Sequence, residues 1–235
     1  MSSPAAAALV GPVGFVAVIG AVSLFVGGRA ARRDGQVDPD QVAAEVSGQM
    51  AAILFVVQAG LAAVAWTLWR AGAVVSTPAT VGAVAVGVAV GVAVFVVYVG
   101  AVERLMVAAQ TRFGDYVPAG TVVDRLTRPP SLFFVANVAL APVAEEVIYR
   151  GFLIPRLAAG WGWWVAVVVV SVAFGLLHWP AGLWYMAATA LFVGLPFGVL
   201  YVWSQSVVVP VAAHLVLNVC EFVLGGVRAW RSQGR

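Results

Sequence analysis

Residues 81–100 read VGAVAVGVAVGVAVFVVYVG, an apolar run with no charged side chain. At about 1.5 Å of rise per residue, a helix of this length crosses a hydrocarbon core of roughly 30 Å. The run is apolar on every helical face, whereas the strands of a membrane barrel alternate apolar and polar residues. This stretch therefore predicts a membrane-spanning α-helix and excludes a barrel strand.

The rest of the chain repeats this composition. Of its 235 residues, 63% are hydrophobic and 10% are charged, whereas a soluble domain is nearer half apolar and a quarter charged. We therefore expect an all-α, polytopic transmembrane bundle of about seven helices, or eight. The seven expected helices cover residues 5–27, 49–69, 79–102, 131–158, 161–178, 182–203 and 205–225. All nine tryptophans fall near the ends of these segments, as expected of indoles that prefer the headgroup region.

The basic residues predict the topology. All thirteen are arginines, and seven spans place most of them on one side of the membrane. The three exceptions are Arg70, Arg150 and Arg156. The positive-inside rule then places the N-terminus outside and the C-terminus in the cytoplasm. We therefore expect a multi-pass protein of a prokaryotic plasma membrane. The connectors 29–48 and 103–130 become cytoplasmic, and the second could hold a surface helix. The net charge of +3 is thus a topology signal, and no nucleic-acid partner is expected.

Three charged residues fall inside the fourth expected helix. If it runs unbroken from residue 131 to 158, kinked at Pro142 or Pro155, Glu145 lies near its midpoint, deep in the bilayer. Such charges are expensive in a membrane and seldom occur without a partner or a task. Glu146 and Arg150 are spaced i, i+4 and can pair on one face. Glu145 points elsewhere, so we expect Glu146 and Arg150 to support the site and Glu145 to carry the chemistry.

The only two histidines also lie in apolar segments. His178 ends the fifth segment, and His214 lies near the middle of the seventh, one turn before Asn218. An imidazole and an amide on one helix face could stabilise the same substrate oxyanion. The structural alternatives are a buried salt-bridge network for the glutamates and helix–helix hydrogen bonds for the histidines and Asn218. Gln58, Tyr149 and Tyr185 are further polar candidates, and Gly82, Gly87 and Gly91 permit close helix packing.

Three short motifs resemble those of one membrane-protein family. Glu145–Arg150 reads EEVIYR and resembles EExxxR, Phe174–His178 resembles FxxxH, and His214–Asn218 resembles HxxxN. Their order and spacing are similar to those of the CPBP family, which comprises type II CAAX prenyl endopeptidases, bacteriocin-processing and immunity proteins, and abortive-infection proteins. The resemblance covers residues 131–225. It implies an intramembrane endopeptidase with a polar cavity inside a helical bundle.

The resemblance also implies a role for each residue. Glu145 and His178 would activate a water, His214 and Asn218 would stabilise the oxyanion, and Glu146 and Arg150 would support them. The chain then divides into an N-terminal transmembrane region at 1–130, a catalytic core at 131–225 and a cytoplasmic tail at 226–235. All three belong to one membrane domain.

The predicted site residues are compatible with two mechanisms, one with a metal ion and one without. Glu145, His178 and His214 have the ligand count of a catalytic zinc site, three protein groups plus water. The HExxH motif is lacking, however, and a desolvated carboxylate with a histidine can generate the nucleophile without a metal. We favour the version with no cofactor, with Zn²⁺ as the alternative.

The alternative hypothesis is that the chain is a membrane protein without catalytic activity. It could be a scaffold or immunity factor of the same fold, or a transporter. A transporter of this size predicts inverted repeats or matching broken helices, and the sequence contains neither. The expected partners are the lipid bilayer and a peptide or protein substrate, whose identity and prenylation the sequence leaves open.

Overall fold

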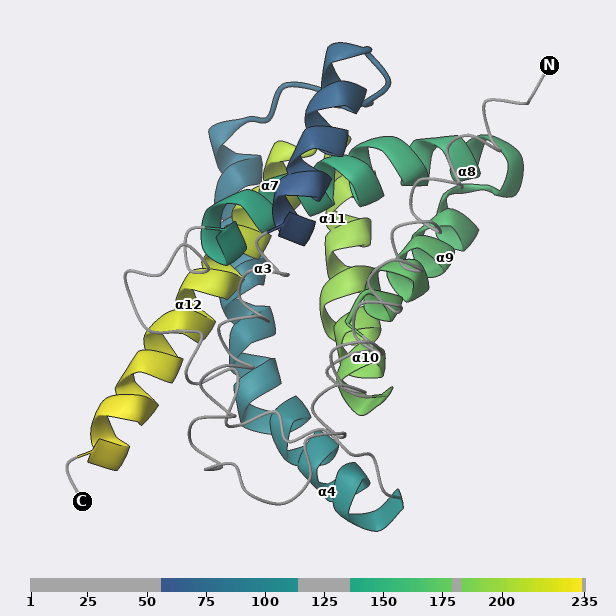
Figure 1. Cartoon of the computed structure of the whole chain (residues 1–235). Helices are drawn as coiled ribbons and strands as arrows, with labels where there is room; N and C mark the ends of the chain where they lie inside the picture. The colour runs from purple at the N-terminus through teal and green to yellow at the C-terminus, as the bar shows by residue number, and fades with distance from the viewer. Residues whose placement is uncertain (1–55, 114–135, 179–182, 234–235) are drawn as a thin grey trace.

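The computed structural model describes residues 56–113, 136–178 and 183–233 (Figure 1). Every regular element in these ranges is a helix, and they contain no strand, which confirms the all-α fold class. A helix at residues 56–70 is followed by α3 (Val81–Val97), α4 (Glu103–Phe113), α7 (Ala141–Glu146), α8 (Ile154–Trp161), α9 (Trp163–Leu176), α10 (Leu183–Thr189), α11 (Leu195–Ser204) and α12 (Val208–Gln233). Wider π-helical turns occupy Tyr98–Val102, Ala136–Leu140, Val147–Leu153 and Ala190–Gly194.

Three of the four π-helical turns come directly before a proline. Pro142, Pro155 and Pro196 each lie in the first two positions of the α-helix that follows. Proline has no N–H to donate, and its ring collides with the carbonyl four residues earlier; widening the preceding turn relieves both problems. The predicted fourth helix is therefore continuous from Ala136 to Trp161, with a widened turn before each of its two prolines.

Two expected helix ends are wrong. The helix predicted to end at 102 continues through α4 to Phe113, and the helix predicted to end at 225 continues to Gln233. Neither extension contains a proline, so nothing forces the backbone out of its hydrogen-bonding pattern. The start of the connector 103–130 is thus a direct continuation of α3 (Figure 1), and the tail 226–235 is mostly helical.

Two described helical stretches are long and apolar enough to cross a membrane, Val81–Phe113 and Leu183–Ser204. Only 17% of the apolar window of the first is buried inside the protein. So large an exposed apolar surface is unfavourable in water, which favours a membrane protein. The helix Ala136–Trp161 does not qualify, because Glu145, Glu146 and Arg150 interrupt it. The described residues thus support a membrane protein without establishing seven or eight spans, and the first predicted span, 5–27, lies outside them.

The tryptophans of the described helices fit this setting. Trp69, Trp161, Trp163 and Trp203 lie within two residues of a helix end, and all four are exposed. An exposed indole at a helix end is typical of the membrane interface. The predicted placement of these four is confirmed.

Two glycines bring α3 and α12 into close contact. A Cβ atom at Gly87 or Gly91 would overlap the backbone carbonyl of Val209 or Ala213. The predicted close packing is thus confirmed for Gly87 and Gly91, whereas a Cβ atom at Gly82 would have no neighbour within 4 Å in the described part of the chain. The contact at Ala213 fixes the position of the next residue on α12, His214.

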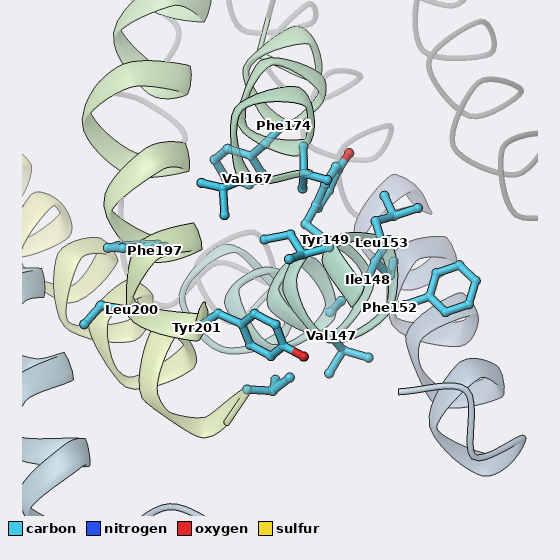
Figure 2. Packing of buried hydrophobic residues seen from close by; sticks show 14 of the residues in the cluster. Val147, Ile148, Tyr149, Phe152, Leu153, Val167, Phe174, Phe197, Leu200 and Tyr201 are labelled. Carbon is cyan, nitrogen blue, oxygen red and sulfur yellow. The ribbon is translucent and has the colours of Figure 1, made fainter. Parts of the chain in front are cut away.

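The buried core surrounds the turn Val147–Leu153 (Figure 2). At Gly151, a Cβ atom would lie 2.6 Å from Val74 and 2.7 Å from Val207. The Gly151 carbonyl accepts a hydrogen bond from Val75 N at 2.8 Å, because Pro155, four residues later, has no N–H to offer. The segment 73–80 is thereby fastened to the helix that carries the charged residues.

Candidate active site

Glu146 and Arg150 form a fully buried ion pair. The Arg150 Nη1 donates to Glu146 Oε1 at 2.9 Å, and both side chains are 0% exposed. The predicted i, i+4 pair is therefore confirmed. Arg150 Nη2 also donates to the Gly194 carbonyl at 3.1 Å, and the guanidinium lies 4.6 Å from the centre of the Phe174 ring. No sequence signal pointed to Gly194, which a distant helix supplies.

His214 lies between the two glutamates. Its Nδ1 is 2.8 Å from Glu146 Oε1, and its Nε2 is 4.0 Å from Glu145 Oε2. A carboxylate paired with arginine accepts hydrogen bonds, so Nδ1 carries the proton and donates to Glu146. This bond fixes the orientation of the ring and leaves Nε2 facing Glu145. The HxxxN spacing pairs His214 with Asn218, and the structure adds both glutamates as its neighbours.

Glu145 is 5% exposed and also meets a residue from the N-terminal half of the chain. Gln58, on the helix at 56–70, is 9% exposed, and its side chain lies close to the Glu145 carboxyl group. The Gln58 Oε1 atom has no hydrogen-bond partner within the part of the chain that the structure describes. The sequence marked Gln58 as a polar candidate without linking it to Glu145.

His178 packs against a phenylalanine ring. Its Nδ1 is 3.0 Å from the Phe174 carbonyl oxygen, and its ring is 5.1 Å from Phe174 and 5.9 Å from Tyr185, between ring centres. The Phe174 ring also lies 6.0 Å from His214. Both imidazoles therefore contact the phenylalanine of the FxxxH motif, which stands in the buried core beside Tyr149 (Figure 2).

Asn218 follows His214 by one turn on α12 and is partly buried. This spacing puts both residues on the same side of the helix, as the sequence analysis expected. All six predicted site residues, Glu145, Glu146, Arg150, His178, His214 and Asn218, lie within the described ranges. Direct contacts join Glu145, Glu146, Arg150 and His214, and His178 joins them through Phe174.

The arrangement does not fit zinc. A tetrahedral zinc with bonds of about 2.0–2.1 Å holds two ligand atoms about 3.4 Å apart, whereas Glu145 Oε2 and His214 Nε2 are 4.0 Å apart. The Nδ1 atoms of both histidines are engaged by Phe174 and Glu146, so only the Nε2 atom of each ring is available to a metal. In the described ranges, no group of three or more His, Cys, Asp or Glu side chains could hold a metal ion. A single water can bridge the same gap.

The similarity to known proteins lies in the same part of the chain as the site. Residues 127–220 match a family described as type II CAAX prenyl endopeptidase Rce1-like. The predicted family resemblance is confirmed. Over 98 residues, the chain is 30% identical to the "Putative membrane peptidase YdiL" of Bacillus subtilis (strain 168). That similarity covers 41% of this chain and 38% of the relative, so the chain spans less than half of the relative's length. No solved structure matches.

The Rce1-like region contains the charged cluster but not all of its surroundings. Glu145, Glu146, Arg150, His178, His214 and Asn218 all fall within residues 127–220. Gln58 and the glycines of α3 that fix α12 lie before it. The N-terminal half of the chain therefore contributes packing and one polar side chain to the site of the Rce1-like region.

Proposed function

We propose that this protein is an intramembrane endopeptidase that hydrolyses a peptide bond with a water activated by Glu145. The observation that supports this most directly is the buried chain of contacts from Arg150 through Glu146 and His214 to Glu145. Its members are at most 6% exposed. Buried charges cost free energy, and this cluster belongs to the Rce1-like region. The relation to a peptidase family makes hydrolysis the function that fits best.

The proposed chemistry begins with a water bridging Glu145 Oε2 and His214 Nε2, which are 4.0 Å apart. Glu145 takes a proton from the water as its oxygen attacks the carbonyl carbon of the substrate. The protonated Glu145 then passes the proton to the leaving nitrogen, and the peptide bond breaks. His178 would help to hold the water, as the family resemblance implies.

His214 and Asn218 would stabilise the oxyanion of the tetrahedral intermediate. Because the Nδ1 proton of His214 is engaged by Glu146, donation from Nε2 requires the doubly protonated imidazolium. Glu146 and Arg150 hold the imidazole in place, so their role is to position it.

The substrate in this proposal is a peptide or protein reached within or beside the bilayer. The family resemblance implies a substrate with a prenylated C-terminal tail. A peptide without the lipid is the alternative substrate. We further propose a multi-pass plasma-membrane protein with an outer N-terminus and a cytoplasmic C-terminus, in which residues 131–225 form the catalytic core and residues 1–130 support it.

The test is cleavage by purified protein in liposomes. The probes are two fluorophore–quencher peptides with a C-terminal CAAX sequence, one with a farnesylated cysteine and one without the lipid. Glu145→Gln keeps the shape of the side chain but removes the base, so turnover should fall by a factor of about 10² to 10⁴. Glu103→Gln on α4 is the matched control and should keep turnover. Turnover retained by Glu145→Gln would contradict the proposal.

A further inference from the structure

Gln58 occupies a position that favours an apolar residue. On the helix at 56–70, Gln58, Leu61 and Ala65 share one face, and all three are buried, at 9%, 7% and 6% exposure. Leu61 and Ala65 belong to the hydrophobic core. A carboxamide in such a place costs free energy unless its hydrogen bonds are made, so its presence calls for a reason.

The oxygen end of this carboxamide has no partner among the described residues. The side chain lies close to Glu145, and a carboxylate can only accept, so the amide nitrogen is the end that can donate to it. The Oε1 atom is buried and unpaired within the same ranges. An acceptor is therefore available beside the carboxylate that would act as the base.

We propose that Gln58 positions Glu145 and the attacking water, an inference that rests on the function proposed above. A water poised for attack has two protons, one pointing to Glu145 and one that needs a second acceptor. The Gln58 carboxamide can act on both partners. Its N–H groups orient the Glu145 carboxylate, and its Oε1 atom accepts a hydrogen bond from the second O–H group of the water. Gln58 lies outside residues 127–220, so the N-terminal half of the chain contributes directly to the reaction.

The test compares two variants of the same helix face. Gln58→Met keeps the length of the side chain and removes the amide, and Leu61→Met alters the neighbouring core position without touching a polar group. With the farnesylated and unmodified CAAX peptides in liposomes, Gln58→Met should lower kcat by about 10²-fold, the loss expected when a reacting group is misplaced by about 1 Å. KM should stay within threefold. Leu61→Met should keep both constants.

A second readout is independent of turnover. The carboxylate stretching band of Glu145, isolated as the infrared difference between wild type and Glu145→Gln, should shift in Gln58→Met and stay in place in Leu61→Met. A band that stays in place in Gln58→Met overturns the contact and with it the inference.

The outcomes separate this inference from the proposed function. If Glu145→Gln is inactive while Gln58→Met has the wild-type kcat, the peptidase assignment stands and the role of Gln58 is refuted. The catalytic role of Gln58 is also refuted if Gln58→Met raises KM and leaves kcat unchanged, because Gln58 would then act in substrate binding. If the wild type cleaves neither peptide, or Glu145→Gln retains turnover, the proposed function fails, and the catalytic role of Gln58 fails with it.

Discussion

Replacing Arg150 by methionine tests the buried charge network most directly. Methionine keeps most of the aliphatic stem but removes the guanidinium, which bonds Glu146 at 2.9 Å and the Gly194 carbonyl at 3.1 Å. Glu146 would remain fully buried with His214 as its only partner among the described residues. Breaking one side of a buried ion pair costs about 3–5 kcal/mol, because the other charge is left uncompensated. We expect Arg150→Met to lower the free energy of unfolding by that amount.

The chain offers a matched control on the same continuous helix. Arg156 is exposed and lies 5.2 Å from the centre of the Phe152 ring. An exposed cation–π contact contributes at most about 1 kcal/mol, so Arg156→Met should change the free energy of unfolding by less than that. The double variant Glu146→Gln, Arg150→Met removes both charges and should be more stable than the single Arg150→Met variant.

The assay is unfolding of the purified protein in mixed micelles by increasing sodium dodecyl sulfate, followed by tryptophan fluorescence and circular dichroism. The reasoning is refuted if Arg150→Met is no less stable than Arg156→Met. It is also refuted if adding Glu146→Gln to Arg150→Met lowers stability further. Either result would mean that the Glu146 carboxylate needs no charged partner in this place.

Two further predictions concern the helix contact and the metal. Gly91→Ala places a Cβ against the Ala213 carbonyl and should lower stability by about 1–3 kcal/mol through overpacking, with kcat falling because His214 moves. Gly82→Ala, whose Cβ would meet no atom of the described residues, should be neutral or slightly stabilising in the same unfolding and cleavage assays. Equal effects of the two glycine variants would argue against the close α3–α12 contact as the cause. Incubation with EDTA or 1,10-phenanthroline should leave peptide cleavage intact, because the Glu145–His214 separation fits a water better than zinc; activity lost to chelation and regained with Zn²⁺ would reverse this assignment.

The sequence predicted local features where local physics decides them. The apolar run at 81–100 can only be helical in a membrane, since a lipid-facing backbone must satisfy its own hydrogen bonds. The Glu146–Arg150 pair followed from helical spacing alone. The prolines at 142 and 155 marked where the fourth helix departs from regular α-geometry. The family resemblance also depended only on the order and spacing of three motifs between Glu145 and Asn218, which lie inside the matched range 127–220.

Helix ends were predicted less well. The continuation of α3 to Phe113 and of α12 to Gln233 occurs where the sequence turns polar but contains no proline. A change in hydropathy marks where a helix leaves the apolar core, and it does not end the hydrogen-bonding pattern of the backbone. The number of membrane spans is a property of the whole chain in its bilayer. Among the described residues, two helical stretches have the length and composition needed to cross a membrane.

The sequence by itself determined that this is an all-helical protein with an Rce1-like region and a set of charged residues that an apolar setting makes costly. Only the tertiary structure decided which of those residues meet. Gly91 against Ala213 places His214 between two glutamates, the Gly194 carbonyl becomes a partner of Arg150, and Gln58 reaches Glu145 from a helix about 90 residues earlier. These contacts depend on how helices distant in sequence pack together, and periodicity within one helix carries no information about the neighbour that its face will touch.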